Sequence, residues 1–204
     1  MRFRILIGLA AWIAAAGLSL AIPPAGRDTA IFAGGCFWCE ETAFEGLPGV
    51  LSVTSGYTGG QAKNPTYEQV SSGSTGHAES VEVAYDPAKI SYERLLEVFW
   101  HNVDPLDGGG QFCDRGTQYR SAIFYKDEAQ RKAAEESRRK LEEEPRFKGK
   151  IATQIVPAST FYPAEEYHQD FYKKNPIRYN SYRLGCGRDA RLKAIWGEAA
   201  GGHR

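Results

Sequence analysis

GGCFWC, residues 34–39, follows directly on the apolar run Thr29–Ala33, and this junction decides the fold around it. The apolar run predicts a buried strand, and the residues from Cys36 to Phe44 predict a helix because they are helix formers with acids in the first turn. A cysteine therefore stands where a strand passes into a helix. Unpaired N–H groups and the positive end of the helix dipole favour a thiolate there, so we expect the pKa of Cys36 to lie below the free value of about 8.5.

The spacing of the two cysteines favours chemistry over packing. Cys36 and Cys39 would lie one turn apart near a helix N-terminus, and the two glycines before Cys36 let other atoms approach the backbone closely. Buried cysteines beside aromatic residues are common in cores, which would explain one cysteine next to Phe37. That alternative explains poorly two cysteines at CxxC spacing, so we interpret the motif as a redox or nucleophilic site.

The rest of the chain predicts one α+β domain with a mixed, mainly antiparallel sheet and helices packed against it. Apolar patterns predict further strands over four segments: Val50–Tyr57, Ser80–Tyr85, Tyr119–Tyr125 and Ile151–Val156. A capping residue, Ser91, and an apolar stripe predict a helix over 91–102. Alternating charges predict a helix over 127–144, and a third, short helix is predicted over 162–174. Residues 103–118 are expected to form a long loop rich in Gly and Asp, a length that in a compact domain is usually functional or disordered.

The N-terminal segment predicts export. Two arginines precede an apolar run from Ile5 to Ala21, which ends in small residues and resembles a secretory signal cleaved after Ala21. We therefore divide the chain into a signal peptide (1–21), a linker (22–28) and one catalytic domain (29–204) with a mobile C-terminal segment. An uncleaved membrane anchor is the alternative, although the run is slightly short for a span. Either way the domain is expected outside the cytoplasm, in the bacterial periplasm and without stable membrane association once the signal is removed.

Composition excludes several classes of protein. The 204 residues, 42% of them hydrophobic, can bury one sizeable core, and nothing indicates two. The formal net charge is zero, so there is no electrostatic case for a nucleic-acid partner. Four cysteines are too sparse for a disulfide scaffold, which favours chemistry over structural cross-linking. We expect neither a cofactor nor a bound metal.

Further short motifs occur in order along the chain: GHAE at 76–79, YDP at 85–87, FWHN at 99–102, GTQYRSA at 116–122 and YHQ at 167–169. Together with GCFW at 35–38 they resemble the motifs of the A-type peptide methionine sulfoxide reductases. The resemblance covers most of residues 29–180. It implies a two-layer α/β sandwich, thiol-dependent reduction of methionine S-sulfoxide, free or in proteins, and repair of oxidised proteins. It also implies a thioredoxin-like reductant.

The resemblance assigns catalytic roles to four residues. Cys36 corresponds to the nucleophile that attacks the sulfoxide sulfur, and Glu79 to the acid that protonates the departing oxygen. Burial would raise the pKa of that carboxyl and keep it protonated near neutral pH. Tyr67 and Tyr119 match the positions whose phenols hydrogen-bond the sulfoxide oxygen.

Other matches concern the walls of the site. Phe37 and Trp38 fit the apolar surfaces that would hold the methyl group of the substrate. Asp114 corresponds to a loop aspartate near the substrate backbone. We interpret His168, in the YHQ motif, as structural support, since a lone histidine on a helix is more often satisfied than catalytic.

A sulfenic acid left on Cys36 needs a second thiol to condense with it to a disulfide. Family members often carry resolving cysteines in a Gly-rich tail soon after Asn-Pro-x-x-Tyr, whereas Asn180 follows that motif here. Three candidates remain for the one role: Cys186, Cys39 and Cys113. We rank Cys186 first, because Gly185 and Gly187 would let its segment swing to the active site, and Cys113 last.

Two other classes of protein fit part of the pattern. A thioredoxin-like disulfide oxidoreductase also uses CxxC at a helix N-terminus, but it leaves the remaining motifs unexplained. A structural zinc module could use all four cysteines, although Cys113 and Cys186 lack a matching CxxC. Metal analysis would separate the zinc module from the two enzymes. Activity on methionine sulfoxide, compared with activity on a protein disulfide, would separate the reductase from the disulfide oxidoreductase.

Overall fold

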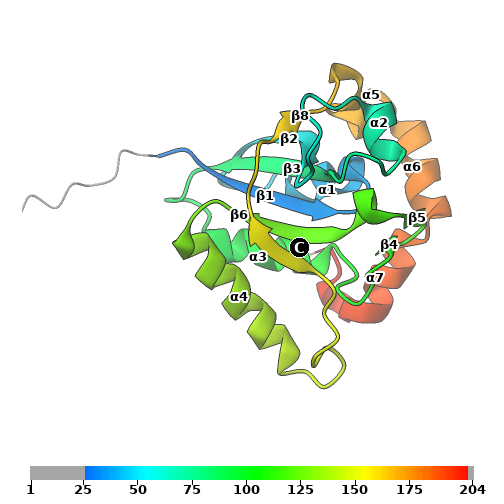
Figure 1. Cartoon of the computed structure of the whole chain (residues 1–204). Helices are drawn as coiled ribbons and strands as arrows, with labels where there is room; N and C mark the ends of the chain where they lie inside the picture. Colours follow the sequence, from blue (N-terminus) through cyan, green and yellow to red (C-terminus); the bar gives the residue numbers. More distant parts are fainter. Residues whose placement is uncertain (1–25, 202–204) are drawn as a thin grey trace, which may run out of the picture.

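The computed structural model describes residues 26–201 and shows a six-stranded sheet with helices packed around it (Figure 1). The strands of this sheet are β1 (Asp28–Gly34), β2 (Val50–Thr58), β3 (Ala78–Tyr85), β6 (Ser121–Tyr125), β7 (Gln154–Pro157) and β8 (Tyr162–Pro163). A separate hairpin consists of β4 (Gly110–Gln111) and β5 (Asp114–Arg115). The α-helices are α1 (Phe37–Phe44), α2 (Tyr67–Ser71), α3 (Tyr92–His101), α4 (Glu128–Glu142), α5 (Phe171–Lys174), α6 (Pro176–Gly185) and α7 (Arg188–Trp196). Three 3₁₀ turns are η1 (Thr117–Tyr119), η2 (Glu166–His168) and η3 (Gly197–Ala199).

The sheet is mixed and mainly antiparallel, with the strand order β7-β6-β1-β3-β2-β8. β1 pairs antiparallel with both β3 and β6, and β2 pairs antiparallel with β3 and β8. The pair of β6 and β7 is parallel. The predicted α+β fold class is therefore confirmed.

From Ala30 to Gly34, strand β1 is apolar and buried, because both faces of the sheet are covered there. On one face Phe32 stacks on Phe44 of α1 and Phe99 of α3, with ring centroids 5.1 and 5.2 Å apart. On the other face Ile31 packs in a smaller cluster with Phe124 of β6. Helix α1 contacts β1, β2 and β3, while α4 contacts β6 and β7 and α3 lies against both helices. These three helices form the helical layer, and β1 delivers Cys36 to the end of α1.

Most predicted elements are present close to their predicted bounds. Ser91 and Asp127 cap α3 and α4 by accepting hydrogen bonds from backbone N–H groups three residues on, as N-cap side chains do. The predicted strand over Tyr119–Tyr125 begins at Ser121, since Tyr119 ends the 3₁₀ turn η1. Within the predicted loop 103–118 the chain forms the β4–β5 hairpin, which carries Asp114.

The prediction of a single helix over 162–174 is wrong. That segment is divided into β8, η2 and α5, and Asp170 adopts a left-handed backbone with φ of 52°. Long-range contacts compete with the helix: the Asp170 N–H donates to the Glu41 carboxylate, and Gln169 exchanges hydrogen bonds with the backbone of Ser55. Tertiary hydrogen bonds thus override the local helical preference.

Three helices that sequence reasoning did not predict are α2, α6 and α7. Figure 1 shows α6 and α7 at one side of the sheet, next to the β4–β5 hairpin. The segment expected to be a mobile tail is thus helical, and Leu192 and Trp196 of α7 are buried in the main core. The predicted signal peptide lies outside the described residues. Between residues 26 and 201, no helix is long and apolar enough to span a membrane.

Candidate active site

One small pocket, with a volume of about 60 Å³, gathers every side chain that the sequence proposed for catalysis and substrate binding. The N-terminus of α1, strand β3, the β4–β5 hairpin and helices α2 and α6 all contribute to it. The residues that line it are Cys36, Phe37, Trp38, Tyr67, Glu79, Asp114, Tyr119 and Tyr182. Segments far apart in the chain therefore meet at the strand-to-helix junction of residues 34–39.

Cys36 is the N-cap of α1, with φ of −60° and ψ of 119°, and its carbonyl accepts from the N–H of Cys39 at 3.0 Å. The two glycines before it are required by their surroundings. A Cβ at Gly34 would lie 2.3 Å from Oε1 of Glu40, and Gly35 has φ of 89°, a left-handed backbone. This tight turn aims the thiol into the pocket, where its residue is only 6% exposed.

The expected lowering of the Cys36 pKa is wrong for this arrangement. Burial raises the pKa of Cys36 well above its ordinary value, and the neighbouring Cys39 and Glu79 raise it further. A hydrogen bond from Cys36 instead lowers the pKa of Cys39 to about 6. Within the buried pair, Cys39 is therefore the thiol that loses its proton more readily. Desolvation outweighs the effect of the helix N-terminus on the first thiol.

Glu79 comes from β3 and is 2% exposed. Its Oε2 accepts a hydrogen bond from the backbone N–H of Phe37 at 3.1 Å. Burial raises the pKa of Glu79 to about 8, although that hydrogen bond opposes the shift. The carboxyl is consequently protonated near neutral pH and can donate a proton inside the pocket, which is the environment expected from the sequence.

The phenols of Tyr67 and Tyr119 reach the same pocket from α2 and η1. Tyr67 is the first residue of α2, whose start is set by a capping box between Thr66 and Gln69. Burial raises the pKa of Tyr67 to about 12 and also raises the pKa of Tyr119. Both hydroxyls therefore keep their protons and remain hydrogen-bond donors.

The apolar wall of the pocket is fixed from behind. The Trp38 indole stacks on Phe171 of α5 with ring centroids 3.7 Å apart, and its Nε1 donates to Nδ1 of His168 at 3.1 Å. Phe37 packs beside His168 at a centroid distance of 4.9 Å. His168 is buried and orients Trp38, which agrees with its interpretation as structural support.

Tyr182 is the pocket residue that sequence reasoning missed. Its hydroxyl donates to Oδ2 of Asp114 and also contacts the Cys36 thiol. The sequence does carry a pattern that predicts this tyrosine. Asn175-Pro176 is typical of a helix start, and Tyr179 and Tyr182, three residues apart, then lie on one face of that helix.

The four cysteines form two pairs. Cys113 and Cys186 are joined in a disulfide that links the β4–β5 hairpin to the end of α6, whereas Cys36 and Cys39 are free and buried. The preference for Cys186 as a free, mobile resolving thiol does not fit this pairing. The zinc alternative loses two of its four thiolate ligands for the same reason.

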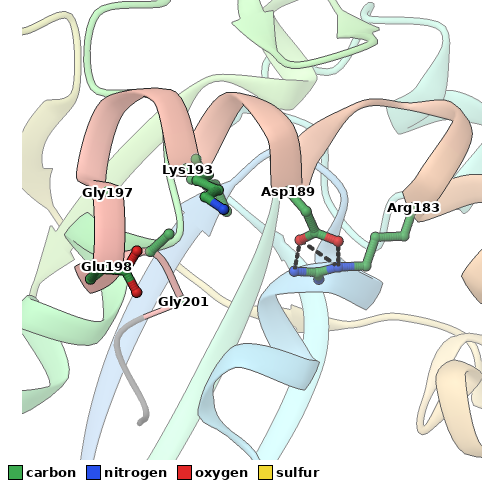
Figure 2. A pocket seen from close by; sticks show the side chains of 8 residues that line it. Arg183, Asp189, Lys193, Gly197, Glu198 and Gly201 are labelled. Carbon is green, nitrogen blue, oxygen red and sulfur yellow. Dashed lines mark hydrogen bonds and ion pairs between the residues drawn. The ribbon is translucent and has the colours of Figure 1, made fainter.

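A second hollow, of about 310 Å³, lies along α7 away from these residues (Figure 2). Arg183 and Asp189 form an ion pair on its wall, with Nη2 and Oδ1 2.6 Å apart. None of the residues proposed from the sequence lines it.

Comparisons with known proteins agree with the geometry of the first pocket. Residues 28–200 match the family model described as peptide methionine sulfoxide reductase. The chain is 57% identical to peptide methionine sulfoxide reductase MsrA of Bacillus licheniformis over 84% of this chain and 94% of that protein. It is 55% identical to MsrA 2 of Caulobacter vibrioides over 95% of this chain and 98% of that protein.

The fold is also similar to solved structures. Reduced Mxr1 of Saccharomyces cerevisiae matches with a TM-score of 0.69 and 34% identity over 76% of this chain and 88% of that chain. A structure of the same yeast protein in complex with Trx2 matches with a TM-score of 0.51 and 26% identity over 76% of this chain and 91% of that chain.

Proposed function

The chain belongs to the peptide methionine sulfoxide reductase family, and on that premise we propose a role for each residue of its active site. It is an A-type enzyme, a peptide-methionine (S)-S-oxide reductase that reduces methionine S-sulfoxide to methionine. The observation that carries the proposal is the convergence of one thiol, one protonated carboxyl and two phenols on a single pocket.

The pocket has the size of a methyl sulfoxide group. Its volume of about 60 Å³ admits a few heavy atoms, since about 10–15 Å³ suffices for one water. We propose that the methyl group lies against Phe37 and Trp38 and that Tyr67 and Tyr119 donate hydrogen bonds to the oxygen. Asp114, held by Tyr182 at the side of the pocket, would contact the substrate backbone.

In the first step the sulfur of Cys36 attacks the sulfoxide sulfur. Its thiol proton passes to the Cys39 thiolate, to which it is hydrogen-bonded, and Glu79 protonates the sulfoxide oxygen. The protonated oxygen moves from the substrate sulfur to the Cys36 sulfur: the S–O bond of the substrate and the S–S bond formed in the attack break, and a new S–O bond forms on Cys36. Methionine leaves, and Cys36 becomes a sulfenic acid. Cys36 is oxidised by two electrons and the sulfoxide sulfur is reduced by two. At this point Cys39 is a thiol and Glu79 is a carboxylate.

Cys39 is the resolving thiol that the structure favours. The Cys39 thiol passes its proton to the Glu79 carboxylate, whose charge acts on Cys39, and the thiolate then attacks the sulfur of the Cys36 sulfenic acid. A Cys36–Cys39 disulfide forms, the S–O bond breaks, and the hydroxide takes the Glu79 proton to leave as water. Cys186 is already bonded to Cys113, which is why we propose Cys39 in place of the first candidate from sequence.

A thioredoxin-like protein is the proposed reductant of that disulfide. The yeast relative has been crystallised in complex with Trx2, and it shares the fold of this chain. Thiol–disulfide exchange would pass two electrons and two protons to Cys36 and Cys39 and return the enzyme to its starting state.

One experiment tests the cycle directly. The enzyme, with Cys36 and Cys39 free, is given one equivalent of methionine S-sulfoxide without a reductant, and methionine release and the disulfide pattern are measured. We expect one methionine per enzyme and a Cys36–Cys39 disulfide beside the Cys113–Cys186 disulfide. A different partner for Cys36 in the peptide map would contradict the proposed resolution step.

Export of the protein is also proposed. Its support is the signal-like composition of residues 1–21 and the Cys113–Cys186 disulfide, a bond that persists outside the reducing cytoplasm. Cell fractionation with N-terminal sequencing tests it. A periplasmic protein that begins at Ile22 is expected, whereas a full-length chain in the membrane fraction would indicate an uncleaved anchor.

A further inference from the structure

The Cys113–Cys186 disulfide takes no part in the proposed catalytic cycle, yet it adjoins the pocket on both sides. Cys113 lies at the tip of the β4–β5 hairpin, in the two-residue turn between Gln111 and Asp114. Cys186 is the C-cap of α6 and follows Tyr182 by one helical turn. Each half of the disulfide is therefore close in the chain to a residue that lines the pocket.

The disulfide and a hydrogen bond to Asp114 bridge the same interface between the hairpin and α6. The Tyr182 hydroxyl donates to Oδ2 of Asp114. Beside it the Cys113 N–H donates to Sγ of Cys186 at 3.1 Å, and the disulfide joins these two residues covalently. Sγ of Cys113 lies 3.8 Å from Oδ1 of Asp114. A hairpin tip bonded to α6 keeps the Asp114 carboxylate against the Tyr182 hydroxyl.

The backbone of the hairpin tip depends on such a constraint. Phe112 has φ of 55°, a left-handed conformation that two-residue hairpin turns usually give to glycine, asparagine or aspartate. Its ring lies under the buried guanidinium of Arg188, with Cζ 4.5 Å from the ring centroid. A bulky residue keeps this backbone only where surrounding contacts enforce it. The disulfide at the next residue supplies a covalent contact of that kind.

The base of the hairpin is fixed without the disulfide. Gln111 is fully buried, and its side chain accepts from the N–H of Asp104 at 2.8 Å and donates to the carbonyl of Asp104 at 2.9 Å. On the exposed side Arg115 forms an ion pair with Asp107. Loss of the disulfide should therefore release the tip, residues 112–114, while the rest of the hairpin stays in place.

The disulfide is open to reduction. Cys113 is exposed and Cys186 is half-buried, whereas Cys36 and Cys39 are 6% and 1% exposed. A dithiol reductant of the class proposed for the active site can therefore attack this bond as well. The S–S bond breaks, Cys113 and Cys186 together gain two electrons and two protons, and the dithiol becomes a disulfide.

We propose that Cys113 and Cys186 are positioning residues for substrate binding: their disulfide holds Asp114 in place for the substrate backbone, and its reduction weakens that contact. This role rests on the proposed contact between Asp114 and the substrate. The attack on sulfur does not depend on the bond, because Cys36 and Glu79 belong to α1 and β3. Affinity for oxidised peptides would then be highest under the oxidising conditions that produce methionine sulfoxide.

The test is a single turnover without a reductant, so that only steps up to the first product count. Two substrates are compared: methionine S-sulfoxide blocked by an amide on each side, and dimethyl sulfoxide, which has no peptide backbone. In Cys113→Ser/Cys186→Ser we expect the apparent Kd of the blocked substrate to rise about tenfold, the lower end for loss of a hydrogen bond to a charged group. Its limiting rate, and the rate with dimethyl sulfoxide, should stay unchanged.

Asp114→Ala shows whether the disulfide acts through Asp114. In that background, loss of the disulfide should not raise the Kd further, because the carboxylate that it positions is absent. Leu96→Ala is the matched control for stability. It truncates a buried core residue of α3, outside the pocket and the hairpin, and should leave the Kd of the blocked substrate unchanged.

The two redox forms of the wild-type enzyme carry the comparison if the serine variant does not fold. Thiol counting distinguishes the form with only Cys36 and Cys39 free from the form with four free thiols, and the second should show the same rise in Kd. Equal Kd values in the two forms would overturn the inference. A slower reaction with dimethyl sulfoxide, or a further rise in Kd in the Asp114→Ala background, would also overturn it.

Failure of the proposed function is recognised separately. If the wild-type enzyme reduces neither substrate, the assigned reaction itself is wrong. If Asp114→Ala binds the blocked substrate as tightly as the wild type, Asp114 does not contact the backbone, and the role of the disulfide falls with that contact. If Asp114→Ala weakens binding while the two redox forms bind equally, only the role of the disulfide is wrong.

Discussion

Oε2 of Glu79 lies 3.1 Å from the backbone nitrogen of Phe37 and accepts its hydrogen bond. This contact places a carboxyl from the middle of the sheet directly beside the residue that follows the proposed nucleophile. The carboxyl is buried and has a raised pKa, so it is protonated near neutral pH and can donate its proton to the sulfoxide oxygen.

Cys36→Ser should abolish sulfoxide reduction. A serine hydroxyl does not ionise near neutral pH, and oxygen is a poor nucleophile toward sulfoxide sulfur. Methionine release is measured by chromatography in the presence of a dithiol, with thermal unfolding as the check that the variant folds. Multiple turnovers by this variant would remove Cys36 from the mechanism.

Glu79→Gln should slow methionine release in a single turnover by roughly ten- to ten-thousand-fold, the usual range for the loss of a general acid. In the wild-type enzyme the protonated carboxyl predominates below its pKa of about 8 and is lost as the pH rises through that value. The single-turnover rate should therefore fall above about pH 8 in the wild type, and this fall should be absent in Glu79→Gln. A near-normal rate in the variant would make Glu79 structural.

Cys39→Ser and Cys113→Ser/Cys186→Ser should behave differently. The first should release one methionine and then stop, with a sulfenic acid on Cys36 that dimedone traps, because the thiol beside Cys36 is missing. The second should continue to turn over with a thioredoxin-type reductant, because its resolving thiol remains. The reverse pattern would restore Cys186 as the resolving cysteine.

Tyr182→Phe should lower kcat/KM by about 10- to 100-fold. The hydroxyl donates to the partly buried Asp114 carboxylate, and a hydrogen bond to a charged group is worth about 1.5–3 kcal/mol. Loss of this donor should raise the pKa of Asp114 further above its ordinary value. Tyr172→Phe is the matched control, since it removes a phenol–carboxylate contact to Glu45 outside the pocket and should leave kcat/KM unchanged.

Removing the Cys113–Cys186 disulfide should destabilise the fold by about 2–4 kcal/mol, because the bond closes a loop between residues 73 positions apart. Urea unfolding of Cys113→Ser/Cys186→Ser against the oxidised wild type measures the difference in free energy of unfolding. The loss should be concentrated in α6 and α7, which hydrogen exchange can localise. An unchanged midpoint would show that packing of α7 alone holds this segment.

Much of the fold follows from local patterns in the sequence. The continuous apolar run before Gly34 predicts a buried strand, and the cap at Ser91 predicts where α3 begins. These signals are local, because side-chain periodicity and capping depend on neighbours within a few residues. The side chains proposed for catalysis and substrate binding also lie together in one pocket, although their roles there stay predictions.

Tertiary structure decided what depends on distant neighbours. The protonation of Cys36 and Cys39 follows from burial and from each other, so the helix N-terminus alone predicted the wrong direction for Cys36. The pairing of Cys186 with Cys113 follows from the docking of α6 beside the hairpin, which no local pattern shows.

The sequence by itself determined the family and the strand–turn–helix that carries Cys36. Only the tertiary structure placed Tyr182 and Arg188 at that turn, because both belong to helices whose position depends on contacts across more than a hundred residues of chain. Electrostatic effects depend on distance and burial in space, so the charges that act on the two thiols could be identified only after the chain had folded.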